Sequence, residues 1–420
     1  MLQKKYIHPA WYALCDYVSA ALAWAVFYFI RIELLQEQQS NYELSYLFWL
    51  EILLIPLGWL MLFLLVGSYY SIYKKSRLNE FTKTIICCII GSVVLFFLIV
   101  LNDVSNSYSY YYSSFLLLFV IHAVIIFLSR MFILNAAKKQ LLNGVIRFYA
   151  AIVGNKESAL RIQRETEKKL RNDGYHIAGF IPLNSSETNV KQLPKLGNID
   201  ELESVIDRAK IKTVILAIDK SEQQTIGQII NRLNEKDVDL KIQPNTLDIL
   251  AGSVKTSNVL GAVLIDLKTN LMPEWQQNIK RLVDIVVSFS ASVLLFPLML
   301  LISLRVRLSS RGPIIYRQER IGFKGKPFWM YKFRSMHMGA EESGPALSSE
   351  NDERITKWGK TMRKWRLDEL PQLWNILKGE MSLVGPRPER KFYIDQIVAQ
   401  FPYYKYLLKV KPGLTSWGMV

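Results

Sequence analysis

The chain has 420 residues, which is more than a single hydrophobic core usually holds and predicts several domains. Half of the residues are hydrophobic and 21% are charged, which excludes a disordered protein and also a membrane bundle standing alone. The formal net charge is +16, and residues 276–420 hold 24 basic and 12 acidic residues. This local excess predicts an anionic partner: a phosphorylated substrate, an acidic lipid headgroup or nucleic acid.

Four hydrophobic runs in the first third of the chain predict membrane-spanning helices. They cover residues 10–30, 46–68, 84–102 and 114–134, and each can cross a hydrocarbon layer of about 30 Å. The first run is too long for the apolar part of a cleaved signal, so we expect it to be retained. The middle of each run lacks charged residues, which favours a membrane anchor over a transporter.

Basic residues in the connecting segments predict the orientation of these spans. Both ends of the bundle and the loop between the second and third spans are basic, whereas the other two loops have Arg31 as their only basic residue. By the positive-inside rule, we expect a multi-pass membrane protein whose residues after about 140 lie in the cytoplasm. The basic residues behind this prediction are Lys4, Lys5, Lys74, Lys75, Arg77, Lys83, Arg130, Lys138, Lys139 and Arg147.

A fifth apolar stretch, from Val283 to Ile302, is flanked by basic residues on both sides. If it crossed the membrane, the basic last third would lie outside the cell, against the positive-inside rule. Pro297 interrupts helical hydrogen bonding inside the stretch. We therefore expect a re-entrant helix that breaks at Pro297 and returns to the same membrane face. The alternative is an ordinary spanning or buried helix with a proline kink.

Between the spans and the basic last third, strand and helix patterns alternate, which predicts a Rossmann-like parallel α/β domain over residues 141–270. A dinucleotide site needs a turn with three glycines after the first strand, and only Gly154 is present there. Because a fold does not determine function, we favour a regulatory or assembly role over nucleotide or ligand binding. The predicted strands are 147–153, 175–181, 213–218 and 239–242, and the predicted helices are 156–170, 200–209 and 222–235.

Cationic and acidic residues of the last third suggest a phosphate site. The alternating segment Pro327–Met336 reads as a strand, in which Lys332 and Arg334 point to one face and could hold a diphosphate. A solvated strand face is the simpler interpretation. Arg387 lies between two prolines, and a rigid arginine fork suits a phosphate clamp.

The adjacent acids Asp368 and Glu369 precede Pro371, where a new helix is expected to begin. The simplest interpretation makes Asp368 an N-cap and Glu369 a first-turn acid. In the functional interpretation, the helix end and nearby cations keep Asp368 ionised. The carboxylate can then attack phosphorus to give an acyl-phosphate, while Glu369 holds Mg²⁺.

Three motifs in this region resemble the signature motifs of bacterial sugar transferases, the monotopic polyprenyl-phosphate phosphoglycosyl transferases. They are Tyr331–Met336 (YKFRSM), Leu367–Gln372 (LDELPQ) and Val384–Pro388 (VGPRP). The resemblance covers residues 278–420. Larger members of that family also carry four spans and a Rossmann-like domain. The resemblance thus implies a transmembrane domain over 1–140 and a catalytic α/β domain over 271–420.

This resemblance implies an enzyme that transfers a sugar-1-phosphate from a nucleotide diphosphate sugar, usually a UDP-sugar, to undecaprenyl phosphate. The products would be undecaprenyl-diphosphate-sugar and UMP, in the first membrane step of capsule, exopolysaccharide or O-antigen synthesis. Asp368 would be the nucleophile that forms a phosphosugar–enzyme intermediate, and Glu369 would be the Mg²⁺ ligand. Lys332, Arg363 and Arg387 would bind phosphates, and the stretch 283–302 would be the re-entrant helix.

Two features depart from the family pattern near the carboxyl end. Ser416 stands where the family usually has glycine before Trp417. Family members also continue past this tryptophan, whereas the chain stops at Val420, so either the chain is truncated or the terminal substrate-contacting part is absent. The identity of the sugar is left open by these departures.

Other functions remain as alternatives. A membrane scaffold or sensor of polysaccharide assembly would not need Asp368 or Glu369. An NAD-dependent sugar-nucleotide dehydratase would need a glycine fingerprint and a Tyr-x-x-x-Lys pair, which occurs only at Tyr70–Lys74 beside a span. The scattered histidines make a zinc site improbable, and the basic residues do not form the open stripe of a nucleic-acid protein. The oligomeric state is left open, with a homodimer as one option, and contact with inner-leaflet lipids is expected.

Overall fold

In the computed structural model the chain forms two compact units. One unit comprises residues 1–217, 241–265 and 274–278, and the other comprises residues 218–240, 266–273 and 279–420. The expected domain boundaries near residues 140 and 270 stay predictions. The structure describes residues 6–34, 46–70, 72–103, 108–172, 174–184, 193–218, 222–233, 236, 238–243, 264–267, 272–340 and 352–416. Lys4, Lys5 and residues 417–420, which entered the predictions above, lie outside the described residues.

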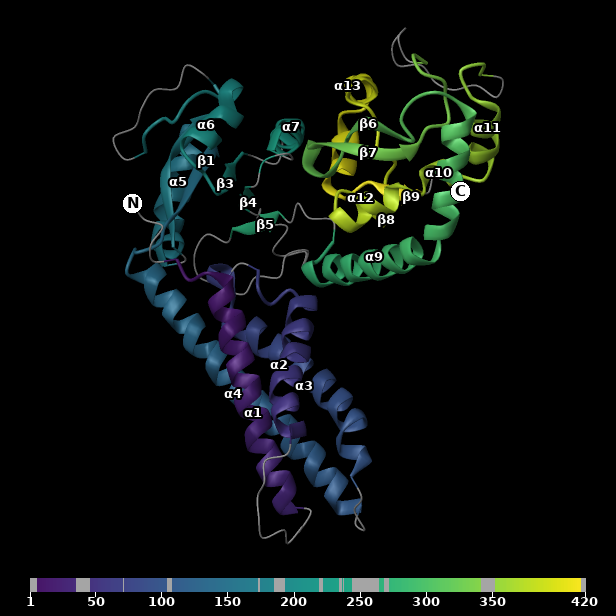
Figure 1. Ribbon diagram of the computed structural model, residues 1–420. Helices are drawn as coiled ribbons and strands as arrows, with labels where there is room; N and C mark the ends of the chain where they lie inside the picture. Colours follow the sequence, from purple (N-terminus) through teal and green to yellow (C-terminus); the bar gives the residue numbers. More distant parts are fainter. Residues whose placement is uncertain are drawn as a thin grey trace. The chain divides into compact units, whose positions relative to one another are not determined.

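Four long helices form a bundle in the first unit (Figure 1). Within the described part of the chain, these four are each long and apolar enough to cross a membrane, which confirms the predicted spans. α1 and α4 extend past their apolar runs at both ends and α3 begins before its run, because flanking polar residues continue the helical hydrogen bonding. α2 and α3 end three and four residues before their predicted runs do. Their bounds are α1 (Pro9–Leu34), α2 (Tyr46–Leu65), α3 (Arg77–Leu98) and α4 (Tyr108–Leu142), with short 3₁₀ turns at Ile72–Lys74 and Val100–Asn102.

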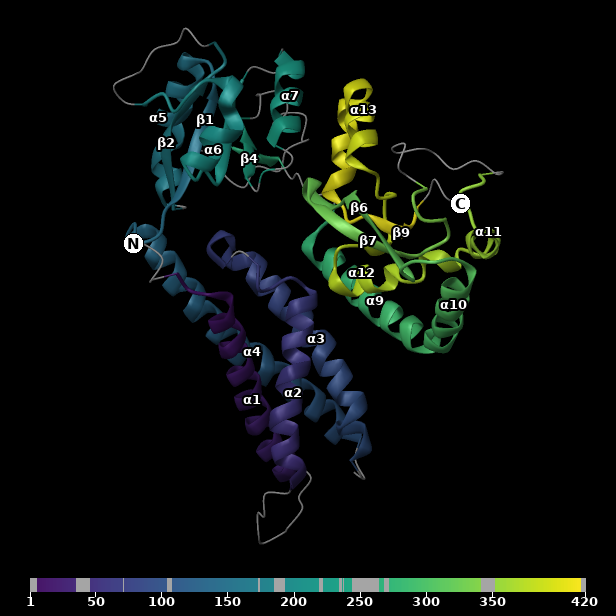
Figure 2. The ribbon, with the colours of Figure 1, turned by 45° about the horizontal axis from the view of Figure 1, so that its top comes forward.

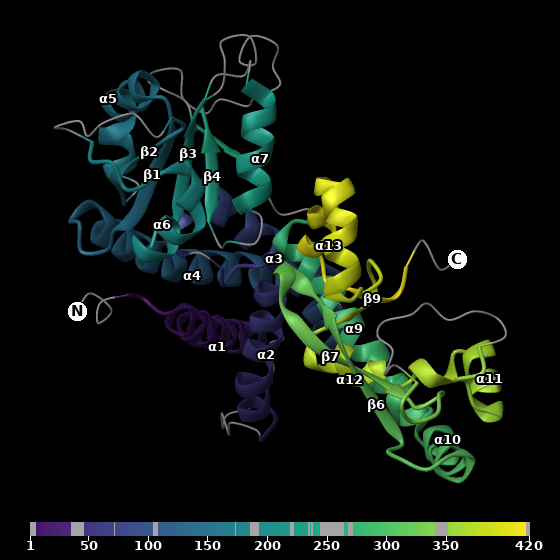
Figure 3. The same cartoon turned by 90° about the horizontal axis from the view of Figure 1, so that it is seen from above.

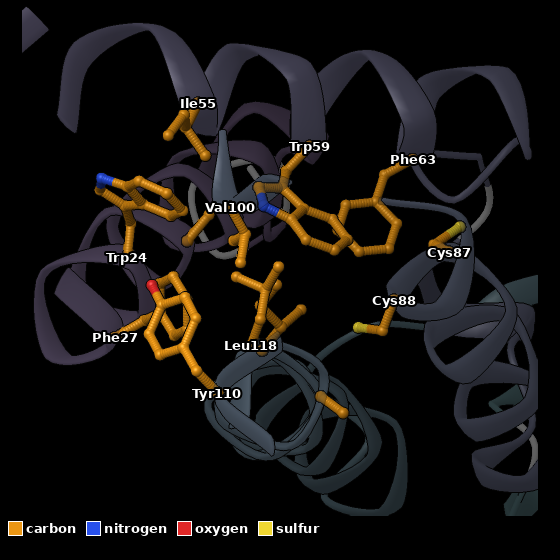
Figure 4. Close-up of a cluster of buried hydrophobic side chains, with 13 residues drawn as sticks. Trp24, Phe27, Ile55, Trp59, Phe63, Cys87, Cys88, Val100, Tyr110 and Leu118 are labelled. Atoms are coloured by element: carbon orange, nitrogen blue, oxygen red, sulfur yellow. The ribbon is translucent and has the colours of Figure 1, made fainter. Parts of the chain in front are cut away.

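Aromatic side chains from different helices pack together inside the bundle (Figure 4). Trp24 of α1, Trp59 of α2 and Leu118 of α4 are all buried there. A Cβ atom at Gly91 of α3 would lie only 2.4 Å from the Trp59 ring, so this close contact requires glycine. Small residues that let helices approach closely are a main source of helix association in membranes.

A cluster of charged side chains is also buried in the bundle, and the sequence analysis did not anticipate it. Arg130 of α4 is fully buried and donates two hydrogen bonds to Asp16 of α1, at 2.9 and 2.7 Å. It also donates to Glu80 of α3 at 3.1 Å. Glu80 accepts a further hydrogen bond from Tyr12 at 2.7 Å and pairs with Lys75 at 2.9 Å. Two cations therefore face two carboxylates, and the cluster ties three helices together.

Most of the predicted parallel α/β sheet lies in the same unit, whereas residues 218–240, which include α7, belong to the second unit. The strand order of the sheet is β2-β1-β3-β4-β5, and β1 pairs in parallel with both β2 and β3. Figure 3 shows β2, β1, β3 and β4 from above. This arrangement confirms the Rossmann-like prediction. The strands are β1 (Phe148–Gly154), β2 (Tyr175–Pro182), β3 (Thr213–Ala217), β4 (Asp239–Ile242) and β5 (Ile265–Leu267), and the helices are α5 (Lys156–Asn172), α6 (Leu202–Arg208) and α7 (Gln223–Leu233).

The single glycine of the first strand–helix turn has a packing reason. A Cβ atom at Gly154 would lie 2.1 Å from the carbonyl oxygen of Ala217, at the end of the neighbouring strand. Any side chain there would push the two strands apart. Gly154 therefore allows the close approach of β1 and β3. This packing explains the glycine, and no phosphate site is needed to account for it.

The predicted re-entrant stretch is a pair of helices with a sharp bend (Figure 2). α9 (Glu274–Leu294) and α10 (Phe296–Ser309) meet at an angle of 63°, which fits either a broken span or a re-entrant loop. The break lies at Leu295, so the predicted position at Pro297 is wrong by two residues. Pro297 instead occupies the first turn of α10, where its missing N–H group costs no helical hydrogen bond.

The rest of the second unit is a small α/β assembly. An antiparallel hairpin is formed by β6 (Ile315–Ile321) and β7 (Pro327–Phe333). β7 is three residues shorter than predicted. Alternate residues of β7, Phe328 and Met330, are buried against Leu373 and Ile376. The remaining elements are α11 (Lys357–Lys364), α12 (Gln372–Lys378), α13 (Lys391–Gln400), the parallel pair β8 (Ser382–Val384) and β9 (Gly413–Thr415), and 3₁₀ turns at Phe323–Gly325, Leu367–Glu369 and Pro402–Lys409.

Candidate active site

A pocket of about 1410 Å³ lies within the second unit, at the ends of its hairpin and short helices. The described residues that line it include ten Lys or Arg side chains but only three carboxylates. Such an excess of positive charge suits a ligand with several phosphates. The cations are Arg307, Arg317, Arg320, Lys332, Arg334, Arg354, Arg363, Arg366, Arg387 and Arg390, and the acids are Asp368, Glu369 and Glu389.

The carboxylate pair lies on a 3₁₀ turn, Leu367–Glu369, between α11 and α12. Arg366 precedes the turn in the left-handed conformation (φ 53°, ψ 25°), which is costly for a residue other than glycine and often marks functional sites. Helix α12 begins only at Gln372, and its cap position is Pro371. The prediction that Asp368 caps this helix is therefore wrong, although the expected change of chain direction occurs there.

Asp368 lies at the wall of the pocket with only 7% of its surface exposed. Burial raises the pKa of its carboxyl group above the usual 3.8, and the neighbouring Glu369 adds to that rise. Lys332 and Arg363 act in the opposite direction and lower the pKa. The cations named by sequence analysis thus do favour the ionised carboxylate, but the larger effect on it is burial.

Glu369 and Lys332 form an ion pair across the pocket wall, with 2.8 Å between Oε1 and Nζ. Both side chains are 22% exposed, so the pair is open to a ligand. Among the described residues, no group of three or more His, Cys, Asp or Glu side chains gathers into a metal site. Mg²⁺ commonly binds one or two carboxylates together with substrate phosphates and water. Adjacent Asp368 and Glu369 carboxylates fit that donor set, provided that phosphates complete it.

Arg334 has a different role from the one predicted. Its side chain is buried, and it donates to the carbonyl oxygens of Pro313 at 2.5 Å and Ser310 at 2.6 Å. A longer hydrogen bond reaches Val306 at 3.5 Å, in the last turns of α10. Burial lowers the pKa of this guanidinium. The guanidinium of Arg334 is hydrogen-bonded to main-chain carbonyls. These contacts do not support the predicted binding of one diphosphate by Arg334 and Lys332 together.

The other two predicted phosphate ligands line the pocket with Lys332. Arg363, in the last turn of α11, donates from Nε to the hydroxyl of Ser335 at 2.9 Å. Arg387 is 60% exposed and has its Nε 3.5 Å from Glu389. The structure therefore brings Lys332, Arg363 and Arg387 to the pocket that also holds the carboxylate pair.

Two further arginines of the pocket were not singled out from the sequence. Arg320, on β6, donates to Glu389 and to the carbonyl oxygen of Pro388, both at 3.1 Å, so it supports the loop that carries Arg387. Arg354 grips Asp352 with two hydrogen bonds of 2.8 and 2.6 Å, which hold the pKa of that carboxyl down at about 2. The sequence patterns predicted no strand at residues 315–321, where β6 lies. The position of Arg320 beside the loop therefore could not be inferred.

Comparisons with known proteins agree with this site. The family model described as "Bacterial sugar transferase" matches residues 275–420, and the one described as "CoA-binding domain" matches residues 65–244. A UDP-glucose:undecaprenyl-phosphate glucose-1-phosphate transferase of Caulobacter vibrioides is 36% identical over 200 residues, covering 47% of this chain and 68% of that protein. The chain belongs to the bacterial sugar transferase family.

Other relatives in this family align over shorter shares of their length. A UDP-N-acetylgalactosamine-undecaprenyl-phosphate N-acetylgalactosaminephosphotransferase of Aeromonas hydrophila is 44% identical over 142 residues, 34% of each chain. A UDP-glucose:undecaprenyl-phosphate glucose-1-phosphate transferase of Xanthomonas campestris is 32% identical over 254 residues, 59% of this chain and 52% of that protein. The chain thus spans about a third to a half of the length of these two relatives.

Proposed function

We propose that this bacterial sugar transferase moves a sugar-1-phosphate from a nucleotide diphosphate sugar, such as a UDP-sugar, to undecaprenyl phosphate. The observation that carries the proposal is the buried carboxylate of Asp368 in a pocket lined by ten cations. Both substrates are anionic, and one nucleophile surrounded by cations suits phosphoryl transfer. The names of the relatives, which act on UDP-sugars and undecaprenyl phosphate, support the same pair of substrates.

In the first step, a carboxylate oxygen of Asp368 attacks the phosphorus that bears the sugar. The bond from that phosphorus to the bridging oxygen breaks, and UMP leaves with the electron pair. Asp368 then carries the phosphosugar as an acyl-phosphate. Lys332, Arg363 and Arg387 neutralise the charge that develops on the phosphate oxygens.

In the second step, an oxygen of undecaprenyl phosphate attacks the same phosphorus and releases the Asp368 carboxylate. The product is undecaprenyl-diphosphate-sugar, and the chain returns to its starting state. Mg²⁺, when bound by Glu369 and the substrate phosphates, would neutralise phosphate charge and orient the diphosphate. Lys332 would then pass from Glu369 to a phosphate oxygen, since both partners are anionic.

We also propose that α9 and α10 enter the membrane and return to the same face. Near the start of the pair, Arg281 hydrogen-bonds to main-chain carbonyls of α12. At the other end, the carbonyls of Val306 and Ser310 bind Arg334. Both ends therefore contact the same α/β assembly, which a helix crossing the whole bilayer could not do. Large apolar side chains are exposed around the bend: Val293, Leu294, Phe296, Leu300 and Leu301.

We infer from this proposed topology that the pocket lies at the inner leaflet, on the cytoplasmic face of the bacterial inner membrane. Cysteines introduced singly near residues 276 and 311 should both react with a membrane-impermeant maleimide only after the inner face is opened. Labelling of the two positions from opposite sides of the membrane would contradict re-entry.

The activity itself is tested by UMP release from a panel of UDP-sugars with undecaprenyl phosphate and Mg²⁺. The wild-type chain is compared with Asp368→Asn and with Asp395→Asn, an exposed carboxylate on α13. We expect release by the wild type and by Asp395→Asn, and none by Asp368→Asn. The sugar that gives the fastest release identifies the donor.

Full activity of Asp368→Asn would remove this residue from the mechanism. If a folded wild-type chain released UMP from no sugar, the proposal would fail, and a scaffold function would take its place.

A further inference from the structure

The first turns of α9 within the second unit carry polar side chains that reach the α/β assembly, although the helix belongs to the apolar pair. Arg281 donates hydrogen bonds to the carbonyl oxygens of Ile376 and Leu377, the latter at 2.7 Å. These two residues form the last turn of α12, whose carbonyls lack the regular i+4 N–H partner of a helix. The Ile376 carbonyl also accepts from the N–H of the cap residue Gly379 at 2.9 Å. A cation at this end also interacts favourably with the helix dipole.

The chain around this contact leaves room for the guanidinium. Gly379 ends α12 in a left-handed conformation (φ 87°), as is common at a helix end. A Cβ atom at Gly379 would lie 3.3 Å from Nη2 of Arg281, tighter than most contacts of its kind. Glycine therefore serves both the turn and the approach of Arg281.

Asp284, one turn further along α9, holds a second element. It is buried and accepts hydrogen bonds from the backbone N–H of Leu383 at 2.9 Å and from the hydroxyl of Ser382 at 3.1 Å. Lys280 lies 3.7 Å from the Asp284 carboxylate and also donates to the Ser382 hydroxyl. Asp284 is thus fixed to β8 by both a main-chain and a side-chain contact.

These two contacts lead to different parts of the candidate active site. α12 follows directly on the turn that carries Asp368, and its two turns span about 10 Å. β8 runs into the loop that carries Arg387. Figure 1 shows α9 alongside both α12 and β8. One face of α9 therefore supports the nucleophile turn through Arg281 and the arginine loop through Asp284.

We propose that Arg281 and Asp284 are positioning residues: Arg281 for the nucleophile Asp368 and Asp284 for the phosphate clamp Arg387. This inference rests on the proposed function and adds a division of labour within α9. The membrane helix α9 then determines both the orientation of the attacking Asp368 carboxylate and the position of the Arg387 guanidinium that binds the diphosphate. Neither residue touches substrate, because each is occupied by main-chain atoms of its own unit.

The two roles predict different kinetic changes. Arg281→Ala should lower kcat about 10- to 100-fold and leave the inhibition constant of UDP within about twofold, because a displaced nucleophile costs rate and not binding. Asp284→Ala should weaken UDP inhibition about tenfold and lower kcat less, because a misplaced Arg387 costs binding as well. Arg281→Lys and Asp284→Asn should recover part of each loss, since each keeps one hydrogen-bonding group.

A matched control separates these roles from a general loss of folding. Arg305 is a cation of the same helix pair that lies over the ring of Trp358 and away from α12 and β8. Arg305→Ala should change neither kcat nor UDP inhibition by more than about twofold. Equal loss of kcat in the Arg281 and Asp284 variants, with unchanged UDP inhibition, would indicate fewer folded molecules and would overturn the proposal.

Amide hydrogen exchange provides a readout that does not depend on activity. Arg281→Ala should speed exchange in a peptide covering residues 367–378, and Asp284→Ala should speed exchange at 382–388. Arg305→Ala should do neither. If the wild type released no UMP, these exchange patterns would still decide the structural part of the inference. Unchanged exchange in both variants would overturn it even in an active enzyme.

Discussion

The four-helix bundle and the candidate active site both bring charged side chains together, but they balance the charge differently. In the bundle, Arg130 is fully buried and surrounded by its own partners, Asp16 and Glu80. In the pocket, the cations outnumber the carboxylates, and Arg387 is largely exposed. Removing one partner of a buried ion pair leaves a buried charge without compensation. An exposed cation that loses its partner is instead stabilised by hydration.

This difference indicates what each group of charges does. The bundle cluster is closed, because every charged group in it already has an opposite charge, so it fixes the packing of the helices. The pocket is open, because its cations outnumber its carboxylates and the side chains of its ion pairs are partly exposed, so that an anionic ligand can reach them. Charge alone therefore does not identify a site. The informative feature is an excess of one sign of charge around an open pocket.

The largest effect is expected from Arg130→Ala. The substitution leaves Asp16 and Glu80 buried without their main cation, which should cost about 3–5 kcal/mol of stability. This loss is measured as a lower unfolding temperature of the purified protein in detergent, with size-exclusion chromatography used to monitor the fraction that remains folded after heating. Arg77→Ala is the control, because Arg77 is exposed on α3 and bonds only to Asn135 among the described side chains. Equal unfolding temperatures for the two variants would show that the cluster is not stabilising.

A smaller effect, on activity alone, is expected from Arg387→Ala. Loss of a charged hydrogen-bond donor to phosphate should lower kcat/KM about 10- to 100-fold. The unfolding temperature should stay within about 1 °C of the wild type, because Arg387 is mostly exposed. Arg311→Ala, an exposed arginine outside the pocket, is the matched control in the same UMP-release assay. Loss of stability in Arg387→Ala would mean that the pocket is as closed as the bundle cluster.

The sequence predicted those features that depend on local patterns. The four spans and four of the five described strands of the Rossmann-like sheet follow from apolar length and alternation, which are properties of neighbouring residues. The short β5 was not predicted. The carboxylate turn at Asp368 was located because its motif is contiguous. Pro297 marked the bend only to within two residues, because a proline can also occupy the first turn of the following helix.

The features that the sequence did not predict depend on contacts between distant segments. The sequence pattern places Lys332 and Arg334 on the same face of a strand and does not distinguish them. Only the folded chain shows that Arg334 already donates hydrogen bonds to carbonyls at the end of α10. Arg281 was counted as a charge flanking a membrane stretch, and its partners in α12 lie 95 and 96 positions away. Arg130 was counted among the basic residues at a span end, whereas it is buried beside Asp16. In each case the missing information is the identity of the partner.

The smallest effect is expected from Lys332→Ala, which should shift the acid limb of the pH–rate profile. Asp368 attacks as a carboxylate, so the acid limb of kcat/KM reports its ionisation in the free enzyme. Burial has already raised the pKa of Asp368, and Lys332 counteracts that rise. Removing the cation should therefore raise this pKa further and move the acid limb to higher pH.

A pH–rate profile of UMP release, measured for wild type, Lys332→Ala and Lys326→Ala, tests this prediction. Lys326 is an exposed lysine at the turn of the same hairpin and lies outside the pocket, so its removal should leave the acid limb in place. A limb that moves to lower pH in Lys332→Ala would contradict the assignment of Asp368 as the ionising nucleophile. A shift in the predicted direction would show that an open cationic pocket acts on its own carboxylate, before substrate binds, in the same way that it acts on a phosphate.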